Sequence, residues 1–522
     1  MIREISRRKC LRLWLCKPEY MERTKWENRF VLLRFRKKNY MMFLKDLKRF
    51  KMERLYDKLK AYSESDFYAF HMPGHKRNKA LLGIELPYDL DITEIDGFDD
   101  LHHADGILKE EQERAARVFG AEESHFLVNG STAGILSAVM GCTHRGDKIL
   151  VARHCHKSIY HAIYMNGLVP RYVYPEFDIS MHMNGEISKE DVAKALAAEP
   201  DIKAVVIVSP NYDGVVSDVK GIAEVAHSYR IPLIVDEAHG PHFGFHPAFP
   251  GRANDLGADV VINSLHKTLP SLTQTAILHI NGKIVNRRRL KKYLDMLQSS
   301  SPSYIFMASL DACVDFVDGK CENAFELYVE RLQKFREELK PLQHLQILRT
   351  EHYDISKVVI STANANITSP ELAERLRKEY HLEMEMTGGT YVLAMTTVAD
   401  TQEGLDRLKA ALLEIDGQLE AKTAVSGSIE ISGELPRLEQ YFTPQEAADR
   451  EEDGEAEEIP WKESEGHISL EYAYLYPPGS PVIVPGERIS REAVELLCYY
   501  ETQNLQIEGI QTEGKIKVWK HE

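Results

Sequence analysis

Cysteine and tryptophan are scarce in this 522-residue sequence, and long apolar runs are missing. The seven cysteines form no CxxC pair, and their odd number argues against a disulfide framework. No stretch approaches the roughly 18 uncharged apolar residues of a membrane-spanning helix. Charges interrupt every apolar run near the N-terminus, so a signal peptide is not indicated. These absences favour a cytoplasmic protein that has no membrane partner.

Positive charge is also in short supply, with 65 Lys and Arg against 80 Asp and Glu and a net charge of -15. Residues 1–51 hold 17 basic and five acidic residues, so this leader carries +12 and the remaining chain -27. The acidic body excludes a dedicated nucleic-acid-binding protein. The leader fits either an arm for an anionic surface or a dispensable, over-extended start before Met52, and we favour the second interpretation.

Two common signatures are incomplete. The segment LIVDEAHG contains the DEAH tetrapeptide of helicases, which need an upstream GxxxxGK[ST] loop. The only approximation begins at Gly509, ends in Ile516 instead of Ser or Thr, and lies far downstream, which argues against an ATPase. His154, His156 and His161 lie close in sequence, but no HExxH or HxxEH motif is present, and we expect no metal site.

Short apolar runs alternate with helical segments from Ile107 onward, after an amphipathic helix that begins near Met52. Continuous apolar runs of this kind are typical of a parallel sheet covered on both faces, which predicts a three-layer α/β domain with a mainly parallel sheet. The expected strands are residues 126–128, 149–152, 172–174, 204–208, 233–236, 260–263 and 276–280.

The pattern changes along the chain and predicts six segments. Long helices with separate strands after Glu322 indicate a smaller α+β domain, and the acidic run REEDGEAEEIP indicates a linker before a C-terminal α+β domain. The segments are the leader (1–51), an N-terminal arm (52–106), the large domain (107–321), the small domain (322–416), the acidic linker (417–465) and the C-terminal domain (466–522).

Three of the predicted strands end in residues that suit one cofactor. VNGSTAG places small and hydroxyl residues, with Ser131 and Thr132, at a helix start, where they can hold an anion. Asp236 ends an apolar strand and needs a cationic partner. Lys267 follows another strand among small and apolar residues, which lowers a lysine pKa and favours a Schiff base. With His156 as a flat ring to stack, these are the groups that a pyridoxal phosphate enzyme needs.

Several further segments occur in the order found in one family. They are FHMPGHKR, DITEIDGFDDLHHADGI, RHCHKS, VDEAHGPHFGFHP, SLHKTL, SSSPSYIFMASLD and YPPGSPVIVPGE. From Met52 onward the chain resembles the pyridoxal-phosphate-dependent ornithine/lysine/arginine decarboxylases of fold type I, the aspartate-aminotransferase architecture. It is similar to the short Gram-positive form, because the leader is too short for the additional N-terminal wing domain of enteric members.

The resemblance implies roles for individual residues. Lys267 would hold the cofactor as an internal aldimine, Asp236 would pair with its pyridinium nitrogen, and Ala238 would pack on the ring face opposite His156. Ser131 and Thr132 would bind the phosphate, with Ser264 and His266 close by. Ser300, in the segment 299–303, would reach the phosphate of a neighbouring subunit, which implies a homodimer with shared active sites. Asn211 stands where the family pattern has Thr.

The implied reaction is α-decarboxylation of arginine, lysine or ornithine to an amine of the polyamine pathway, with Lys267 or His266 returning the proton to Cα. The alternatives are a fold type I aminotransferase, a β-eliminating lyase or a catalytically silent vitamin B6 protein. The substrate stays open. Acidic residues for its distal cation are sought at six positions: Asp91, Glu94, Asp96, Asp99, Asp100 and Glu487.

Overall fold

The computed structural model describes residues 54–179, 183–421, 434–475, 479–502, 505 and 507–520, so the basic leader lies outside the described residues. The chain enters through helix α3 (Leu55–Ser63), followed after an irregular arm by α4 (Ile107–Phe119). Helix α4 ends at Gly120, whose φ of 72° is the left-handed conformation that glycine adopts easily. The sequence predicted a helix near Met52 and helical segments from Ile107 onward, which agrees with these two helices. Across the described ranges, no helix is long and apolar enough to cross a membrane.

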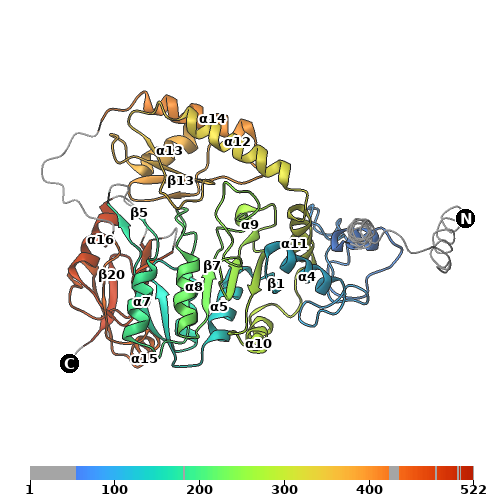
Figure 1. Ribbon diagram of the computed structural model, residues 1–522, viewed down its shortest axis with the longest axis horizontal. Helices are drawn as coiled ribbons and strands as arrows, with labels where there is room; N and C mark the ends of the chain where they lie inside the picture. The colour runs from blue at the N-terminus through green and yellow to red at the C-terminus, as the bar shows by residue number, and fades with distance from the viewer. Residues whose placement is uncertain are drawn as a thin grey trace, which may run out of the picture. The chain divides into compact units, whose positions relative to one another are not determined.

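A seven-stranded sheet forms the centre of the large domain (Figure 1). Strand β9 runs antiparallel to both of its neighbours, β8 and β1, and the other pairs are parallel. This confirms a mainly parallel sheet. The strands, in order across the sheet, are β1 (Glu123–Leu127), β9 (Ala276–Ile280), β8 (Val260–Asn263), β7 (Leu233–Asp236), β6 (Val205–Val208), β2 (Lys148–Ala152) and β3 (Val169–Val173).

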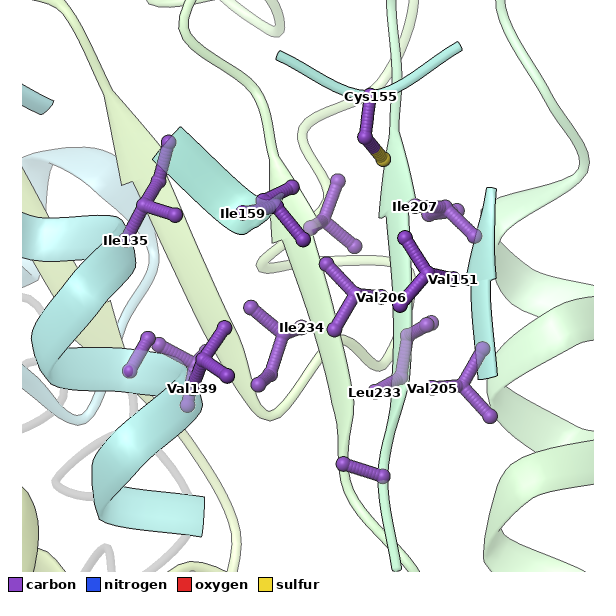
Figure 2. Packing of buried hydrophobic residues seen from close by; sticks show 14 of the residues in the cluster. Ile135, Val139, Val151, Cys155, Ile159, Val205, Val206, Ile207, Leu233 and Ile234 are labelled. Carbon is purple, nitrogen blue, oxygen red and sulfur yellow. The ribbon is translucent and has the colours of Figure 1, made fainter. Parts of the chain in front are cut away.

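Helices pack on both sides of this sheet. Figure 2 shows Ile135 and Val139 of α5 pointing toward strand residues such as Val206 and Ile234, which are all buried. Helices α7 and α8 contact each other and lie in front of the strands in Figure 1. These helices are α5 (Gly130–Cys142), α6 (Lys157–Met165), α7 (Lys189–Ala198), α8 (Val219–Ser228), α9 (Leu265–Thr268), α10 (Arg287–Leu297) and α11 (Tyr304–Val317).

Burial explains which strands the sequence predicted accurately. Every residue of β7, β8 and β9 is buried, and their bounds match the prediction. The edge strands β1 and β3 begin three residues earlier than expected, because polar or proline residues such as His125 and Pro170 mask their first halves. The short hairpin of β4 (Phe177–Asp178) and β5 (Met183–Asn184) was not predicted, since two-residue strands leave no periodic pattern.

The small domain contains a four-stranded antiparallel sheet and three helices. Its strands follow the order β10 (Gln346–Leu348), β11 (Lys357–Ser361), β13 (Tyr391–Met395) and β12 (Met386–Thr387). The helices are α12 (Glu322–Glu338), α13 (Ser369–Tyr380) and α14 (Gln402–Asp416). Helix α13 begins with a capping box in which Thr368 and Glu371 each bind the other's backbone N–H.

The C-terminal part begins earlier than the sequence suggested, which corrects the predicted linker at 417–465. Residues 422–433 lie outside the described residues, but from 434 onward the chain is built into the fold. Trp461 is buried in a cluster with Ile516 and Val518. The acidic run suggested a linker, but β15 pairs with a strand that bears lysines. Ion pairs such as Lys517–Glu451 offset the negative charge of the run.

Short strands dominate this C-terminal part. They form the pairs β14–β18 and β15–β20 and the three-stranded sheet β17–β16–β19. The elements are β14 (Glu439–Gln440), α15 (Pro444–Glu452), β15 (Ala456–Pro460), η1 (Trp461–Glu463), β16 (Ala473–Leu475), β17 (Pro481–Ile483), β18 (Glu487–Arg488), α16 (Arg491–Thr502), β19 (Ile507–Glu508) and β20 (Lys515–Trp519).

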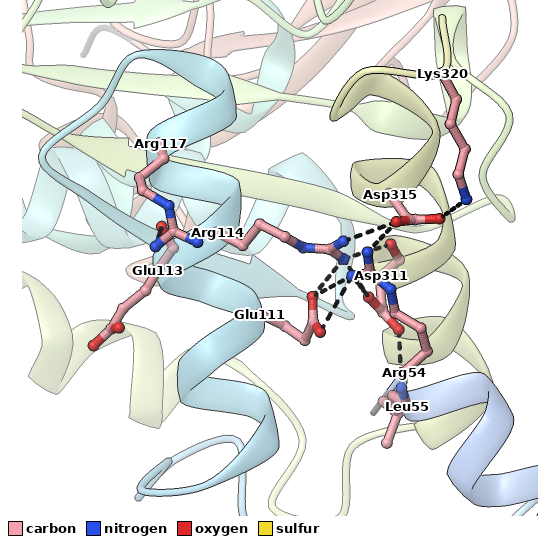
Figure 3. A network of polar contacts seen from close by, with 9 residues as sticks. All are labelled: Arg54, Leu55, Glu111, Glu113, Arg114, Arg117, Asp311, Asp315 and Lys320. Carbon is pink, nitrogen blue, oxygen red and sulfur yellow. Dashed lines mark hydrogen bonds and ion pairs between the residues drawn. The ribbon is translucent and has the colours of Figure 1, made fainter. Parts of the chain in front are cut away.

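A polar network attaches the N-terminal arm to the large domain (Figure 3). The guanidinium group of Arg114 on α4 contacts the carboxylates of Glu111 and Asp311, each at 2.5 Å. Arg54, next to α3, contacts the same two carboxylates at 3.5 and 3.4 Å. The backbone N–H of Leu55 donates to Asp311 at 2.9 Å. Because each buried carboxylate meets two guanidinium groups, the network fixes α3 against α4 and α11.

Candidate active site

One cavity of about 240 Å³ lies at the carboxyl ends of the central strands, where open α/β sheets bind ligands. It collects residues from the large sheet, from the helices that follow its strands and from the C-terminal part. Its lining residues are Gly130, Ser131, Thr132, Ile135, His154, His156, Val208, Tyr212, Asp236, Ala238, His239, Ser264, His266, Lys267 and Ser480.

Two hydroxyl side chains meet at one end of this cavity. The Oγ atoms of Ser131, in the first turn of α5, and Ser264, directly after β8, are 2.5 Å apart. Gly130 has a φ of 72°, and its N–H donates to the carbonyl of Gln274, which brings the start of α5 to the cavity wall. The unpaired N–H groups of a helix start and adjacent hydroxyls form a cup that suits a phosphate group.

Asp236 is a buried carboxylate at the last position of β7. Burial raises its pKa, whereas the charge of Lys267 and the N–H of Ala238, which donates to Oδ1 at 3.1 Å, lower it. A carboxylate withdrawn from water in this way is stabilised by a cationic partner inside the cavity. A protonated ring nitrogen of a ligand meets that requirement.

Lys267 lies on the single turn of α9 and extends its amine into the cavity. Its Nζ is 2.9 Å from Nε2 of His239. Burial lowers the pKa of Lys267, and the positive charge of Lys357 lowers it further, against the opposing effect of Asp236 and Glu385. A lowered pKa increases the fraction of neutral amine, which is the nucleophilic form.

Three histidines of the lining differ in their hydrogen bonds. His156 caps α6, and its Nδ1 accepts the N–H of Ser158 at 3.2 Å, which orients the ring. Burial lowers the pKa of His154 and of His156 to about 4, so both rings are neutral at pH 7. The Nδ1 of His266 is 2.9 Å from the carbonyl oxygen of Thr275, which makes Nδ1 the donor and leaves Nε2 as an acceptor.

The structure therefore brings together eight of the nine residues predicted for the site; Ser300 is exposed and does not line the cavity. Asn211 does not line it either. Its Oδ1 accepts the N–H groups of Gly214 and Val215, at 3.0 and 2.8 Å, so it closes a turn.

Seven residues of the lining were not among the predicted site residues. Three of them, His239, Tyr212 and Ser480, contribute polar groups for which the sequence had suggested no role. The ring of His239 lies 4.5 Å from that of Tyr212, measured between centroids. His239 belongs to the DEAH tetrapeptide, and that position directly after a strand-end Asp was the available signal. Tyr212 stands in a loop next to Asn211. Ser480 lies in the segment YPPGSPVIVPGE, which indicated the family but no role for this hydroxyl.

A fully buried ion pair connects the C-terminal part to the cavity wall. Nη2 of Arg153, one residue after β2, donates to Glu487 at 2.9 Å and to the carbonyl of Val482 at 3.0 Å. The hydroxyl of Ser480, two residues before Val482, donates to the carbonyl of His154, which follows Arg153, at 2.8 Å. Glu487 is thus committed to Arg153, which corrects its interpretation as an acceptor for the substrate.

The other acidic candidates near the arm do not line the cavity. Asp99 accepts backbone N–H groups of Asp105, Gly106 and Leu108 and so stabilises the start of α4. Asp91 pairs with His75 at 3.2 Å. Among the described residues of the lining, Asp236 is the single carboxylate.

Comparison with protein families matches two adjacent regions of the chain. Residues 53–421 match the family model of the Orn/Lys/Arg decarboxylase major domain, and residues 433–514 match that of the C-terminal domain. The chain belongs to the Orn/Lys/Arg decarboxylase family. It is accordingly an amino acid decarboxylase, which confirms the resemblance drawn from its motifs.

Named relatives support the same assignment. The chain is 33% identical over 471 residues to a Bacillus subtilis protein called arginine decarboxylase. The alignment covers 87% of this chain and 95% of that protein. A Bacillus anthracis arginine decarboxylase is 32% identical over 487 residues, covering 89% and 97%. The constitutive lysine decarboxylase of Escherichia coli is 24% identical over 548 residues, covering 84% and 75%.

Solved structures confirm the fold. The lysine decarboxylase LdcF of Francisella novicida superposes with a TM-score of 0.77 at 20% identity, covering 92% of this chain and 84% of that one. The constitutive lysine decarboxylase of E. coli gives 0.77 at 21% identity, covering 96% and 86%. The chain therefore has the fold type I architecture predicted from its sequence.

Proposed function

We propose that this member of the family removes the α-carboxylate of arginine, lysine or ornithine with pyridoxal 5'-phosphate as its cofactor. The observation that carries this proposal is the meeting of Lys267 and Asp236 in one cavity with the hydroxyl cup of Ser131 and Ser264. These residues come from three different strand ends. Their convergence is what a phosphate, a ring nitrogen and an aldehyde on a single cofactor require.

The residues fit the cofactor group by group. The Ser131 and Ser264 hydroxyls, with Thr132, would hold the phosphate at the start of α5. Asp236 would hold the protonated ring nitrogen, which supplies the cation that this buried carboxylate lacks. His156 would cover one face of the ring as a neutral flat group, and Ala238 would leave room on the other. The bound cofactor withdraws the electrons released when the bond from Cα to the carboxylate breaks.

The chain's own side chains control the protons. Lys267, with its lowered pKa, would supply the amine that holds the cofactor. His239 is neutral because burial lowers its pKa well below the usual value, and its Nε2 positions the Lys267 amine. After CO2 leaves, Lys267 or His266 would return a proton to Cα; in His266, Nε2 must first take up a proton, because it is an acceptor in the neutral ring.

We also propose that two copies of the chain share their active sites, with Ser300 reaching the partner's phosphate site. The described arm exposes a group of large apolar side chains, and exposed apolar patches of this kind mark interfaces. Phe67, Tyr68 and Phe70 are 69%, 70% and 89% exposed. Light scattering on the eluting protein should give twice the 59.6 kDa of one chain. A monomer at micromolar concentration would contradict the dimer.

A direct assay tests the proposed reaction. Purified protein should absorb as a lysine-linked pyridoxal enzyme and release CO2 from at least one of arginine, lysine and ornithine, measured side by side. The product should be the matching amine, in the cytoplasmic route to polyamines. Formation of a keto acid without CO2 would instead identify an aminotransferase.

A further inference from the structure

A basic amino acid substrate carries a distal cation that the cavity must recognise. The lining described above contains a single carboxylate, Asp236, which lies at the end of β7 and is committed to the cofactor by the proposed function. The acidic residues of the arm, between Asp91 and Asp100, lie outside the lining, and Glu487 is paired with Arg153. An acceptor for the distal cation must therefore come from a residue next to the lining.

Glu385 is a carboxylate joined to the cavity wall by one hydrogen bond. It precedes β12 in the small domain, and its backbone N–H donates to the carbonyl of Leu393 at 2.9 Å, which anchors this position to β13. Its Oε1 accepts the hydroxyl of Tyr212. Tyr212 lines the cavity and packs its ring against His239, which in turn contacts the Lys267 amine.

The negative charge of Glu385 acts on the Lys267 amine inside the cavity. Two carboxylates raise the pKa of Lys267 through space, Asp236 and Glu385, against the effects of burial and of Lys357. Asp236 is buried, but Glu385 is exposed and so is available to a ligand that enters from solvent. Its second oxygen, Oε2, accepts no hydrogen bond from any other residue in the described part of the chain.

We propose that Glu385, oriented by the Tyr212 hydroxyl, pairs with the distal ammonium or guanidinium group of the substrate. This inference rests on the proposed decarboxylation and names the residue that selects basic over neutral amino acids. A charge-assisted hydrogen bond between a carboxylate and a cation is stronger than one between neutral groups, and it discriminates against a side chain that lacks the charge. Tyr212 acts as a positioning residue because it restricts the rotation of an otherwise mobile Glu side chain.

The Glu385→Gln variant of the holoenzyme tests this role because it keeps the shape of the side chain and removes its charge. We expect KM for the preferred basic amino acid to rise about 10- to 100-fold, with a smaller change in kcat. The Tyr212→Phe variant should give a weaker rise in KM. Glu383→Gln is the matched control, since Glu383 is an exposed carboxylate two residues away, and its KM should equal that of the unmodified enzyme.

Binding without turnover separates charge recognition from a general defect. Calorimetric titration of the amine product should show the same 10- to 100-fold loss of affinity in Glu385→Gln. The affinity for norleucine, a competing ligand without a distal charge, should be unchanged. Equal losses for both ligands, or an unchanged KM, would overturn the role of Glu385 while leaving the decarboxylation intact. If the unmodified holoenzyme released no CO2 from any basic amino acid, the proposed function would fail, and this inference with it.

Discussion

Replacing Lys267 with Ala should reduce CO2 release by roughly 10⁴-fold or more, as expected when the group that forms the covalent bond is lost. The same variant should lose the absorbance of a lysine-linked cofactor. The physical reason is that Lys267 is the one lysine in the cavity lining among the described residues, and the nearby amine of Lys357 is paired with Asp354. Steady-state rates and the absorption spectrum of the same preparation measure both effects.

The surface variant Lys292→Ala is the control, because Lys292 is exposed on α10 and does not line the cavity. It should keep full activity and the full spectrum. Circular dichroism should show that Lys267→Ala remains folded, so that the loss of activity is not a loss of structure. Turnover by Lys267→Ala at more than a few per cent of the normal rate would refute the proposed role.

Breaking the Arg153–Glu487 pair should produce a large loss of stability. Both side chains have no exposed surface, and each would leave an uncompensated buried charge or dipole if the other were removed. Losing one partner of such a pair costs about 3–5 kcal/mol of unfolding free energy. We therefore expect Arg153→Met and Glu487→Leu each to lower the free energy of unfolding by about that amount, measured by chemical denaturation.

The double variant Arg153→Met/Glu487→Leu decides between loss of packing and loss of charge pairing. Because it removes both charges, it should be more stable than either single variant. Arg491 and Glu495 on α16 form an exposed pair, with 73% and 42% of their side chains accessible. Glu495→Gln should change stability by less than about 1 kcal/mol. Single variants at Arg153 and Glu487 that matched this small effect would show that the buried pair adds little.

Local patterns predicted much of the fold because each pattern had a local physical cause. Strands β7, β8 and β9 are buried along their whole length, so their apolar residues run without interruption. Helix α4 ends where Gly120 adopts a positive φ. The acidic segment before the C-terminal strands misled the prediction, because its charge is offset by lysines that follow much later in the chain, such as Lys517.

The residues of the site also differ in whether a local sequence pattern could predict them. Asp236, Lys267 and the Ser131 hydroxyl follow the carboxyl ends of strands that run in the same direction, and such ends lie at one edge of a sheet. The sequence alone therefore determined the family, the fold class and eight residues of the cavity. Only the tertiary structure showed that Glu487 pairs with Arg153, that Ser480 completes the wall and that Tyr212 connects Glu385 to the cavity. These residues come from segments far apart in the chain, and no local pattern records which side chains folding brings into contact.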